Sequence, residues 1–262
     1  MIHVVADDPD VRGFEEYYAA VGPDLARIPW AALRPHPELV AWLDTLAAAA
    51  PAGHPAAATG GCTAGGRPAD TGGSPAEAGG SPAGAGRGAA DAGGSPADAR
   101  GSSAAGAGGR TALVIGCGLG DDAEEVARRG WRVTAFDAAP TAIRWCLRRF
   151  PGSPVEYRVA DLFALPDTTY DLVVEINTIQ ALPPGRRPAT IAAIAATVAP
   201  GGTLFVRCLA REDDTPPRGR PWPVSRAELA AFGDAGLRMR SFADTPATRR
   251  TSRHFCAVYE RA

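Results

Sequence analysis

The sequence contains no lysine, since all 27 of its basic residues are arginine. Without lysine, the chain cannot form the Schiff base of pyridoxal phosphate enzymes. It also cannot build a P-loop that ends in Gly-Lys-Ser/Thr, or the common protein kinase machinery. The 29 acidic residues leave a formal net charge of −2, which argues against a nucleic acid partner held by electrostatics.

Paired cysteines and long apolar runs are also missing. The five cysteines stand at 62, 117, 146, 208 and 256, with no pair at two-residue spacing, so the sequence indicates neither a disulfide framework nor a metal site. No run approaches the ~20 apolar residues of a membrane span. The first ten residues are acidic and lack an apolar targeting core. We therefore expect a cytoplasmic protein with no membrane and no nucleic acid partner.

Large apolar side chains are absent from one long segment. No Leu, Ile, Val, Met or aromatic residue lies between Leu46 and Leu113, and GGSPA recurs at 72–76, 79–83 and 93–97. A segment of Ala, Gly, Pro and Ser has little to bury against its ordering entropy. The composition predicts a disordered insertion over 51–110, between an N-terminal helical segment at 1–50 and a core domain at 111–262.

The stretch 111–137, TALVIGCGLGDDAEEVARRGWRVTAFD, carries the strongest functional signal. An apolar run of strand length leads into three alternating glycines, and apolar residues then recur at helical spacing. Glycines at such a strand-to-helix turn let the backbone approach a ligand closely. Asp137 ends the next apolar run, where a carboxylate can accept hydrogen bonds from ribose hydroxyls. The pattern indicates a nucleoside pocket.

Two acids after the glycines bear on which nucleoside is bound. A dinucleotide site places its pyrophosphate on the helix N-terminus, where Asp121 and Asp122 would repel it. The sulfonium and ammonium of S-adenosylmethionine would suit these carboxylates better. The alternative is that both acids merely cap the helix.

Apolar runs alternate with helical stretches through most of the core, which predicts an α/β fold with a doubly wound, mostly parallel sheet. The last two runs are joined by a loop too short for a crossover helix, so the last strand should be antiparallel. Upstream, 11–46 predicts two short helices, the second at about 37–47. The expected seven strands are 112–115, 132–136, 155–159, 171–176, 203–208, 237–242 and 254–259.

Several blocks resemble class I S-adenosylmethionine-dependent methyltransferases, in the order that this family has them. VIGCGLG resembles the first glycine motif, TAFDAAPTAI the acidic motif of the second strand, and VADLFAL the segment that faces the adenine. YDLVVEINTIQALP, APGGTLFVR and the closing pair LRMRSFAD and SRHFCAVYER continue the likeness over 110–262. RIPWAALRPHPELVAWL is similar to the lid of thiopurine-methyltransferase-like small-molecule enzymes. The resemblance implies a Rossmann-like methyltransferase fold, with 1–50 as a lid.

The resemblance also implies a set of residues that bind S-adenosylmethionine. The glycine turn and Asp137 would hold the methionyl and ribose parts, and Asp161 would recognise the adenine amino group. A turn at Asp161, a solvated loop around Glu175 and a core position for Trp30 are the structural alternatives. The expected cofactor-binding residues are Trp30, Gly116, Cys117, Gly118, Gly120, Asp137, Ala138, Asp161, Leu162 and Glu175.

Other polar and aromatic residues have less defined roles. A polar cluster ends an apolar run and could surround the methionyl group and the acceptor; its members are Glu175, Asn177, Thr178 and Gln180. Tyr17, Tyr18 and Trp222 could line an acceptor pocket or simply pack loops onto the body. We expect no nucleophile at Cys117, because no base is near it in sequence, and a structural role for His254.

The function implied is methyl transfer from S-adenosylmethionine to a small-molecule acceptor, such as a thiol or another soft nucleophile. No catalytic base is identified by the sequence. A non-catalytic binding module with a methyltransferase fold is the main alternative. A nicotinamide oxidoreductase is less favoured, because of Asp121 and the expected antiparallel last strand.

Overall fold

The structure is a computed structural model that describes residues 9–49, 109–213, 215–217, 219–249 and 251–262. The expected insertion at 51–110 lies outside these residues, apart from Gly109 and Arg110. The two parts on either side of it, up to residue 49 and from 109 onward, belong to one compact unit.

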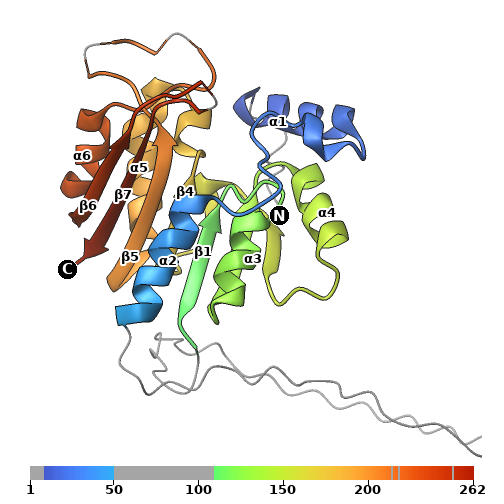
Figure 1. The fold of residues 1–262 in the computed structure, drawn as a ribbon, viewed down its shortest axis with the longest axis horizontal. Helices are drawn as coiled ribbons and strands as arrows, with labels where there is room; N and C mark the ends of the chain where they lie inside the picture. The colour runs from blue at the N-terminus through green and yellow to red at the C-terminus, as the bar shows by residue number, and fades with distance from the viewer. Residues whose placement is uncertain (1–8, 50–108, 214, 218, 250) are drawn as a thin grey trace, which may run out of the picture. The chain divides into compact units, whose positions relative to one another are not determined.

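Seven strands form one sheet in the order β3-β2-β1-β4-β5-β7-β6 (Figure 1). The first five strands are parallel to one another, and β7 is antiparallel to both β5 and β6. The predicted doubly wound sheet with an antiparallel last strand is therefore confirmed. The strands are β1 (Thr111–Ile115), β2 (Arg132–Asp137), β3 (Glu156–Val159), β4 (Tyr170–Ile176), β5 (Val198–Leu209), β6 (Leu237–Thr245) and β7 (His254–Arg261).

Helices separate the parallel strands and cover both faces of the sheet. Short 3-10 turns, η2 (Leu25–Arg27), η3 (Leu162–Ala164), η4 (Ile179–Ala181) and η5 (Pro184–Arg186), punctuate the loops. The two N-terminal helices predicted from 11–46 are present as α1 and α2. The helices are α1 (Pro9–Val21), α2 (Pro37–Ala49), α3 (Asp121–Arg128), α4 (Pro140–Arg149), α5 (Arg187–Ala196) and α6 (Arg226–Asp234).

Alternation along the central strands divides the core into two layers. Val173 of β4 packs with α5 and α6 on one face, while Leu172 and Val174 pack with α2 and α3 on the other. Buried strands in a parallel sheet carry apolar residues on both faces, which explains the continuous apolar runs in the sequence. Trp42 of α2 lies against Phe205 of β5, with ring centroids 5.2 Å apart.

The N-terminal segment spans the edge of the sheet where the parallel strands end. Figure 1 shows α2 lying along the sheet beside β1 and β5, and α1 beside α4. Glu15 of α1 accepts a hydrogen bond from the Thr141 amide at 2.8 Å, which fixes α1 to the start of α4. Among the described helices, none has the length and hydropathy needed to cross a membrane.

Candidate functional site

The turn between β1 and α3 is built from glycines that no other residue could replace without strain. Gly116 has φ +57°, and a Cβ there would lie 2.2 Å from Oγ1 of Thr178. Gly120 has φ +90°, caps α3, and would place a Cβ 2.6 Å from the hydroxyl of Tyr157. Positive φ and close neighbours both demand glycine. The turn therefore exposes backbone at the carboxyl end of β1.

Asp137 stands at the end of β2, beside this turn. Its Oδ2 accepts a hydrogen bond from the Gly118 amide at 2.9 Å, and its Oδ1 accepts one from the Ala139 amide at 2.9 Å. Burial raises the pKa of the Asp137 carboxyl, although both amides oppose that shift. Each carboxylate oxygen has two lone pairs, so both can still accept a hydroxyl from a ligand. Ala138 follows, half-buried, at the same edge.

Asp161 follows β3 and caps the short turn η3. Its Oδ1 accepts a hydrogen bond from the Phe163 amide at 2.9 Å, which is the turn anticipated as a structural alternative. Leu162 is buried in the core, while Phe163 is exposed beneath the guanidinium of Arg186, 4.4 Å from the ring centroid. A cap uses one carboxylate oxygen, so the capping role is compatible with recognition of a ligand amine by the other.

Glu175 is fully buried near the end of β4, on the face covered by α5 and α6. Its Oε1 accepts hydrogen bonds from the amides of Thr178 and Ile179 at 2.7 and 2.8 Å, so the carboxylate holds the loop after β4 from behind. Burial raises the pKa of Glu175 to about 7. Its Oε2 is buried without a hydrogen bond among the described residues. Glu175 thus stabilises the loop after β4 from inside the core.

Asn177 is the residue of that loop that faces Arg207 on β5. It adopts φ +65°, an unusual conformation for a residue other than glycine, which often marks functional sites. Its amide donates to the Arg207 carbonyl at 2.9 Å, and its Oδ1 accepts from Nη1 of Arg207 at 3.1 Å. Thr178 in turn donates to the Ile115 carbonyl at 3.1 Å, which ties this loop to the glycine turn.

Trp30 lies in an aromatic cluster between α1 and the glycine turn. Its Nε1 donates to the Tyr18 hydroxyl at 2.8 Å, and its ring contacts Phe14 and Tyr17 with centroids 5.3 and 4.8 Å away. Tyr18 is buried, with its hydroxyl 3.3 Å from where a Cβ on Gly118 would lie. Trp30 keeps 38 % of its surface exposed. The N-terminal segment therefore stands over the turn with one aromatic side chain partly open.

The surroundings of Cys117 disfavour its thiolate form. Its thiol is paired with Cys146, and that contact, burial and the nearby Asp137 carboxylate raise its pKa well above the ordinary value. The absence of a nucleophile at Cys117 is therefore supported by its surroundings. The Cys117 amide donates to the Phe136 carbonyl at 2.8 Å, which makes its backbone part of the turn.

The structure corrects the role given to Asp121 and Asp122. Asp121 forms a two-pronged ion pair with Arg149, at 2.7 and 2.8 Å. Asp122 accepts a hydrogen bond from the His36 amide at 2.8 Å, and its other carboxylate oxygen lies 2.8 Å from Nδ1 of the His36 ring. Both carboxylates therefore have partners inside the protein, Arg149 for Asp121 and His36 for Asp122. They fasten α4 and the segment before α2 to α3, so their charges are weak evidence for a cationic ligand.

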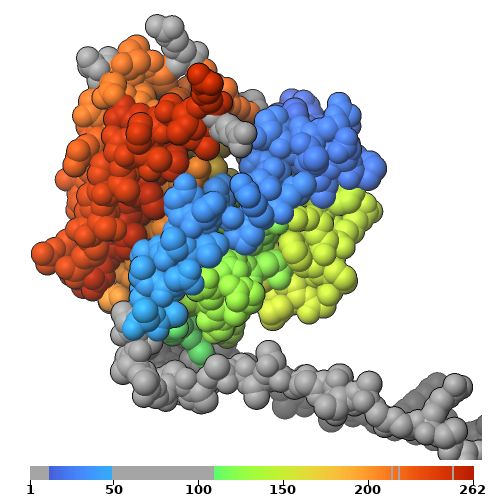
Figure 2. Space-filling view, viewed as in Figure 1, coloured from blue at the N-terminus to red at the C-terminus, as the bar shows by residue number. Residues whose placement is uncertain are grey.

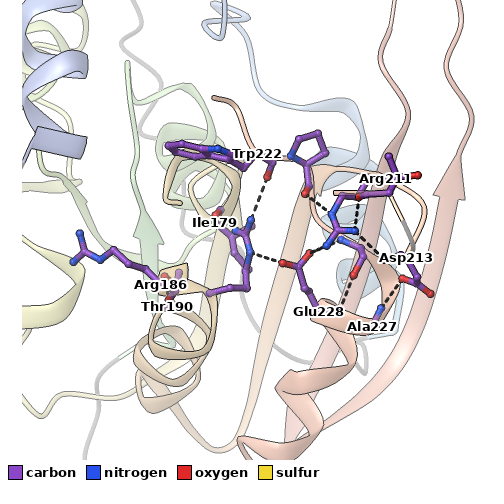
Figure 3. Close-up of polar contacts among 12 residues, drawn as sticks. Ile179, Arg186, Thr190, Arg211, Asp213, Trp222, Ala227 and Glu228 are labelled. Carbon is purple, nitrogen blue, oxygen red and sulfur yellow. Dashed lines mark hydrogen bonds and ion pairs between the residues drawn. The ribbon is translucent and has the colours of Figure 1, made fainter. Parts of the chain in front are cut away.

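A second network, which the sequence did not reveal, holds the loops above β4 and β5 (Figure 3). Arg187, buried at the start of α5, donates to the carbonyls of Ile179 and Trp222 and to Oε1 of Glu228, the last at 3.2 Å. Glu228 also pairs with Arg211 at 3.0 Å and completes a capping box with Ser225 at the start of α6. No local motif signals a buried arginine of this kind.

The structure brings the expected residues to one edge of the sheet. The glycine turn, Asp137, Ala138 and Asp161 follow β1, β2 and β3, and Asn177 follows β4, so four strand ends meet where α/β sheets bind ligands. Trp30 reaches this edge through Tyr18. Glu175 supports the edge from behind, and Trp222 is fixed to the Gln180 carbonyl at 2.7 Å, beyond β4.

Comparison with known proteins places this edge in a recognised domain. Residues 112–202 match the family described as "Methyltransferase domain". The chain is 37 % identical over 108 residues to a ubiquinone biosynthesis O-methyltransferase of Xanthomonas campestris, a match covering 39 % of this chain and 44 % of that one. The chain thus spans less than half the length of the curated relative it matches.

Solved structures show the same fold. A S-adenosylmethionine-dependent methyltransferase of Methanosarcina mazei superposes with a TM-score of 0.51 at 19 % identity, covering 58 % of this chain and 92 % of that one. The cyclase SpnF superposes with a TM-score of 0.52 at 17 % identity, covering 59 % and 75 %. Residues 112–202 are thus similar to a methyltransferase domain, and the chain shares the fold of an S-adenosylmethionine-dependent methyltransferase.

Proposed function

We propose that the protein transfers a methyl group from S-adenosylmethionine to a small-molecule acceptor. The single observation that carries this proposal is Asp137 at the end of β2, held by the Gly118 amide of the glycine turn with its oxygens still able to accept hydroxyls. Asp137 would bind the ribose and Asp161 the adenine amino group, while Leu162 would contact the ring. The backbone of 116–118 and Trp30 would line the remainder of the cofactor site.

In such a site the cofactor supplies a methyl group on a sulfonium, which reacts by in-line displacement. The protein's contribution is alignment of the acceptor and exclusion of water. Trp30 and Tyr18 lie over the glycine turn, and Arg187 with Glu228 fixes the loop after β4 and the loop before α6.

The acceptor's chemistry is part of the proposal. The sequence resemblance to thiopurine-methyltransferase-like enzymes favours a thiol or another soft nucleophile. The curated relative is named an O-methyltransferase, which adds hydroxyl oxygen as a second accepting atom.

Calorimetric titration with S-adenosylhomocysteine tests the cofactor site. Replacing Asp137 with Ala should weaken binding by about 1–3 kcal/mol, the range for losing a charge-assisted hydrogen bond. Asp167→Ala, an exposed residue of the same type between η3 and β4, is the matched control and should bind like the wild type. Absence of binding by the folded wild-type protein would refute the proposal.

A non-catalytic binding module is a second candidate, since the cyclase SpnF shows that this fold also serves proteins not named as methyltransferases. The two candidates differ in whether bound S-adenosylmethionine is consumed. Formation of S-adenosylhomocysteine with any member of a panel of thiols, phenols and amines supports the enzyme. Tight cofactor binding without turnover across the panel supports the module.

A further inference from the structure

Three ionisable side chains from distant parts of the sequence meet at the carboxyl edge of the sheet, beside the candidate cofactor site. Glu38 opens α2, Arg207 lies near the end of β5, and His254 begins β7. Nε2 of His254 is 2.7 Å from Oε1 of Glu38, and Nε of Arg207 is 3.5 Å from Oε2 of the same carboxylate. We call Glu38, Arg207 and His254 the rim triad.

The rim triad lies next to the loop that follows β4. Arg207 binds both the backbone and the side chain of Asn177, which directly follows β4. His254 pairs with Leu209, the last residue of β5. Figure 2 shows the upper part of α2, in light blue, packed beside the orange and red strands of the C-terminal half. The triad is thus on the side of β4 and β5, away from Asp137 and Asp161.

The three side chains of the rim triad differ in how deeply they are buried. The His254 side chain is 4 % exposed, that of Arg207 15 %, and that of Glu38 29 %. Nδ1 of His254 faces the Ser252 carbonyl at 3.2 Å, while Nε2 faces Glu38. The side chains of His254 and Arg207 therefore lie deeper than that of Glu38, which is the most exposed of the three.

Glu38 remains ionised in these surroundings. Burial opposes ionisation, but its own backbone amide, Arg207 and His254 together lower the pKa of the Glu38 carboxyl below the ordinary value. Oε2 of Glu38, Nε of Arg207 and Nε2 of His254 are all buried without a hydrogen bond of good geometry among the described residues. A buried polar atom without a hydrogen bond costs free energy of folding, so a cluster of such atoms calls for a functional explanation.

We propose that Glu38 binds the methyl acceptor through a hydrogen-bond donor on that acceptor, and that Arg207 and His254 are positioning residues for Glu38. This inference rests on the proposed function. It names the acceptor as a protic nucleophile, such as a hydroxyl, thiol or amine, and disfavours a carboxylate acceptor, which a carboxylate at the rim would repel.

The proposed interaction fits the balance of the reaction. As the acceptor heteroatom forms its bond to the methyl carbon, the bond from that carbon to sulfur breaks and its electron pair stays on sulfur. The methylated acceptor then gives up to water the proton that had pointed at Glu38. Because the pKa of Glu38 is lowered, the carboxylate orients the donor and does not keep the proton.

Binding of small probes to protein saturated with S-adenosylhomocysteine tests the inference without knowledge of the true acceptor. Phenol, benzylamine and benzoate have similar size, and only benzoate lacks a donor at neutral pH. We expect Glu38→Gln to weaken phenol and benzylamine by at least about fivefold, as for loss of a hydrogen bond to a charged group, and to strengthen benzoate. Glu260→Gln, which alters an exposed pair with Arg240 on the edge of the sheet, is the matched control.

The positioning role has its own readout. Arg207→Lys keeps the charge but loses the planar fork, and His254→Gln removes the ring that faces Glu38. Both should shift the order of the three probes toward that of Glu38→Gln, which a loss of stability alone would not do. Thermal unfolding of each variant separates the two effects.

Several outcomes would overturn the inference. These are a wild-type preference for benzoate over phenol, an unchanged probe order in a folded Glu38→Gln variant, or binding of no probe at millimolar concentration. Titration of the same variants with S-adenosylhomocysteine reports separately on the proposed function. Loss of that binding in the wild type would refute the methyltransferase proposal itself, whereas normal binding with an unchanged probe order refutes only the role of Glu38.

Discussion

Glu175 shows how a single buried carboxyl can make the candidate site sensitive to pH. Burial raises its pKa to about 7, while the amides of Ile179 and Thr178 and the charges of Arg187 and Arg207 oppose that shift. A carboxyl whose folded pKa is raised destabilises the fold when it ionises. Stability should therefore fall as pH rises from the ordinary value of 4.5 to about 7, and then remain level.

Glu175→Gln should remove this dependence. The shift from 4.5 to about 7 corresponds to roughly 3 kcal/mol of unfolding free energy. Relative to the wild type, we expect the variant to gain up to that amount between pH 5 and pH 8, measured by urea unfolding. Glu156→Gln, at an exposed position on β3, should show no such gain. Parallel stability curves for wild type and Glu175→Gln would contradict the expected pKa.

Gly116 is the residue of the turn where substitution should be most costly. Its φ of +57° strains any other residue, and a Cβ would overlap Oγ1 of Thr178. We expect Gly116→Ala to lower the unfolding free energy by about 1–3 kcal/mol and to weaken S-adenosylhomocysteine binding. Gly185→Ala, at a glycine with open space and no positive φ, is the control. A stable Gly116→Ala variant with normal affinity would show that the turn tolerates a side chain.

At the scale of elements, the buried arginine of α5 connects loops that belong to different strands. Arg187 is 3 % exposed and bonds to the loop after β4, to the loop before α6 and to Glu228. Removing one partner of a buried ion pair leaves an unpaired charge and typically costs about 3–5 kcal/mol. Glu228 also keeps Arg211 and the cap of α6, so the cost should lie near the lower end of that range.

Arg187→Met should therefore destabilise the fold by about 3 kcal/mol, measured by urea unfolding. Arg240→Met, which breaks an exposed pair on β6, should cost under about 1 kcal/mol. A double-mutant cycle with Glu228→Gln isolates the coupling between the two buried groups. Equal losses for Arg187→Met and Arg240→Met would show that burial adds nothing to the pair.

The bounds of helices and strands could be predicted where a local apolar pattern sets them, and less well where pairing between strands sets them. The seven predicted runs overlap β1 to β7. For the buried central strands, such as β1 and β4, the reason is that a strand covered on both faces needs a continuous apolar stretch. β5, however, begins at Val198, five residues before the expected start. Its Pro200, Gly201 and Gly202 suggest a turn, but Val198 still pairs with Tyr170 across a register shift, as in a bulge.

The residues of the candidate site also fall into two groups, those that a local sequence pattern predicts and those that depend on contacts distant in sequence. Asp137 and the glycine turn were predictable because parallel strands bring their carboxyl ends to one edge. Glu38, Arg187 and the partners of Asp121 were not, since each depends on contacts between residues 28 to 216 positions apart that no local pattern encodes.

At the scale of the whole molecule, the compact unit is interrupted in sequence between α2 and β1. Figure 1 shows the last turn of α2 and the start of β1 at the same edge of the sheet, opposite the candidate site. A connection placed there does not need to cross the site. The composition of the segment 51–110 predicts a neutral spacer. That role remains a proposal, which a shortened chain can test.

Replacing residues 50–108 with a ten-residue Gly/Ser linker should leave the fold and the cofactor site intact. Loop closure cost grows with the logarithm of length, so shortening about sixty residues to ten should stabilise the fold by up to about 1.5 kcal/mol. Urea unfolding measures that gain, and calorimetry with S-adenosylhomocysteine should give an unchanged affinity. A loss of more than about 2 kcal/mol would exceed any loop-closure effect and would mean that the replaced residues pack against the core. A normal fold with weakened affinity would instead assign the segment a role in the cofactor site.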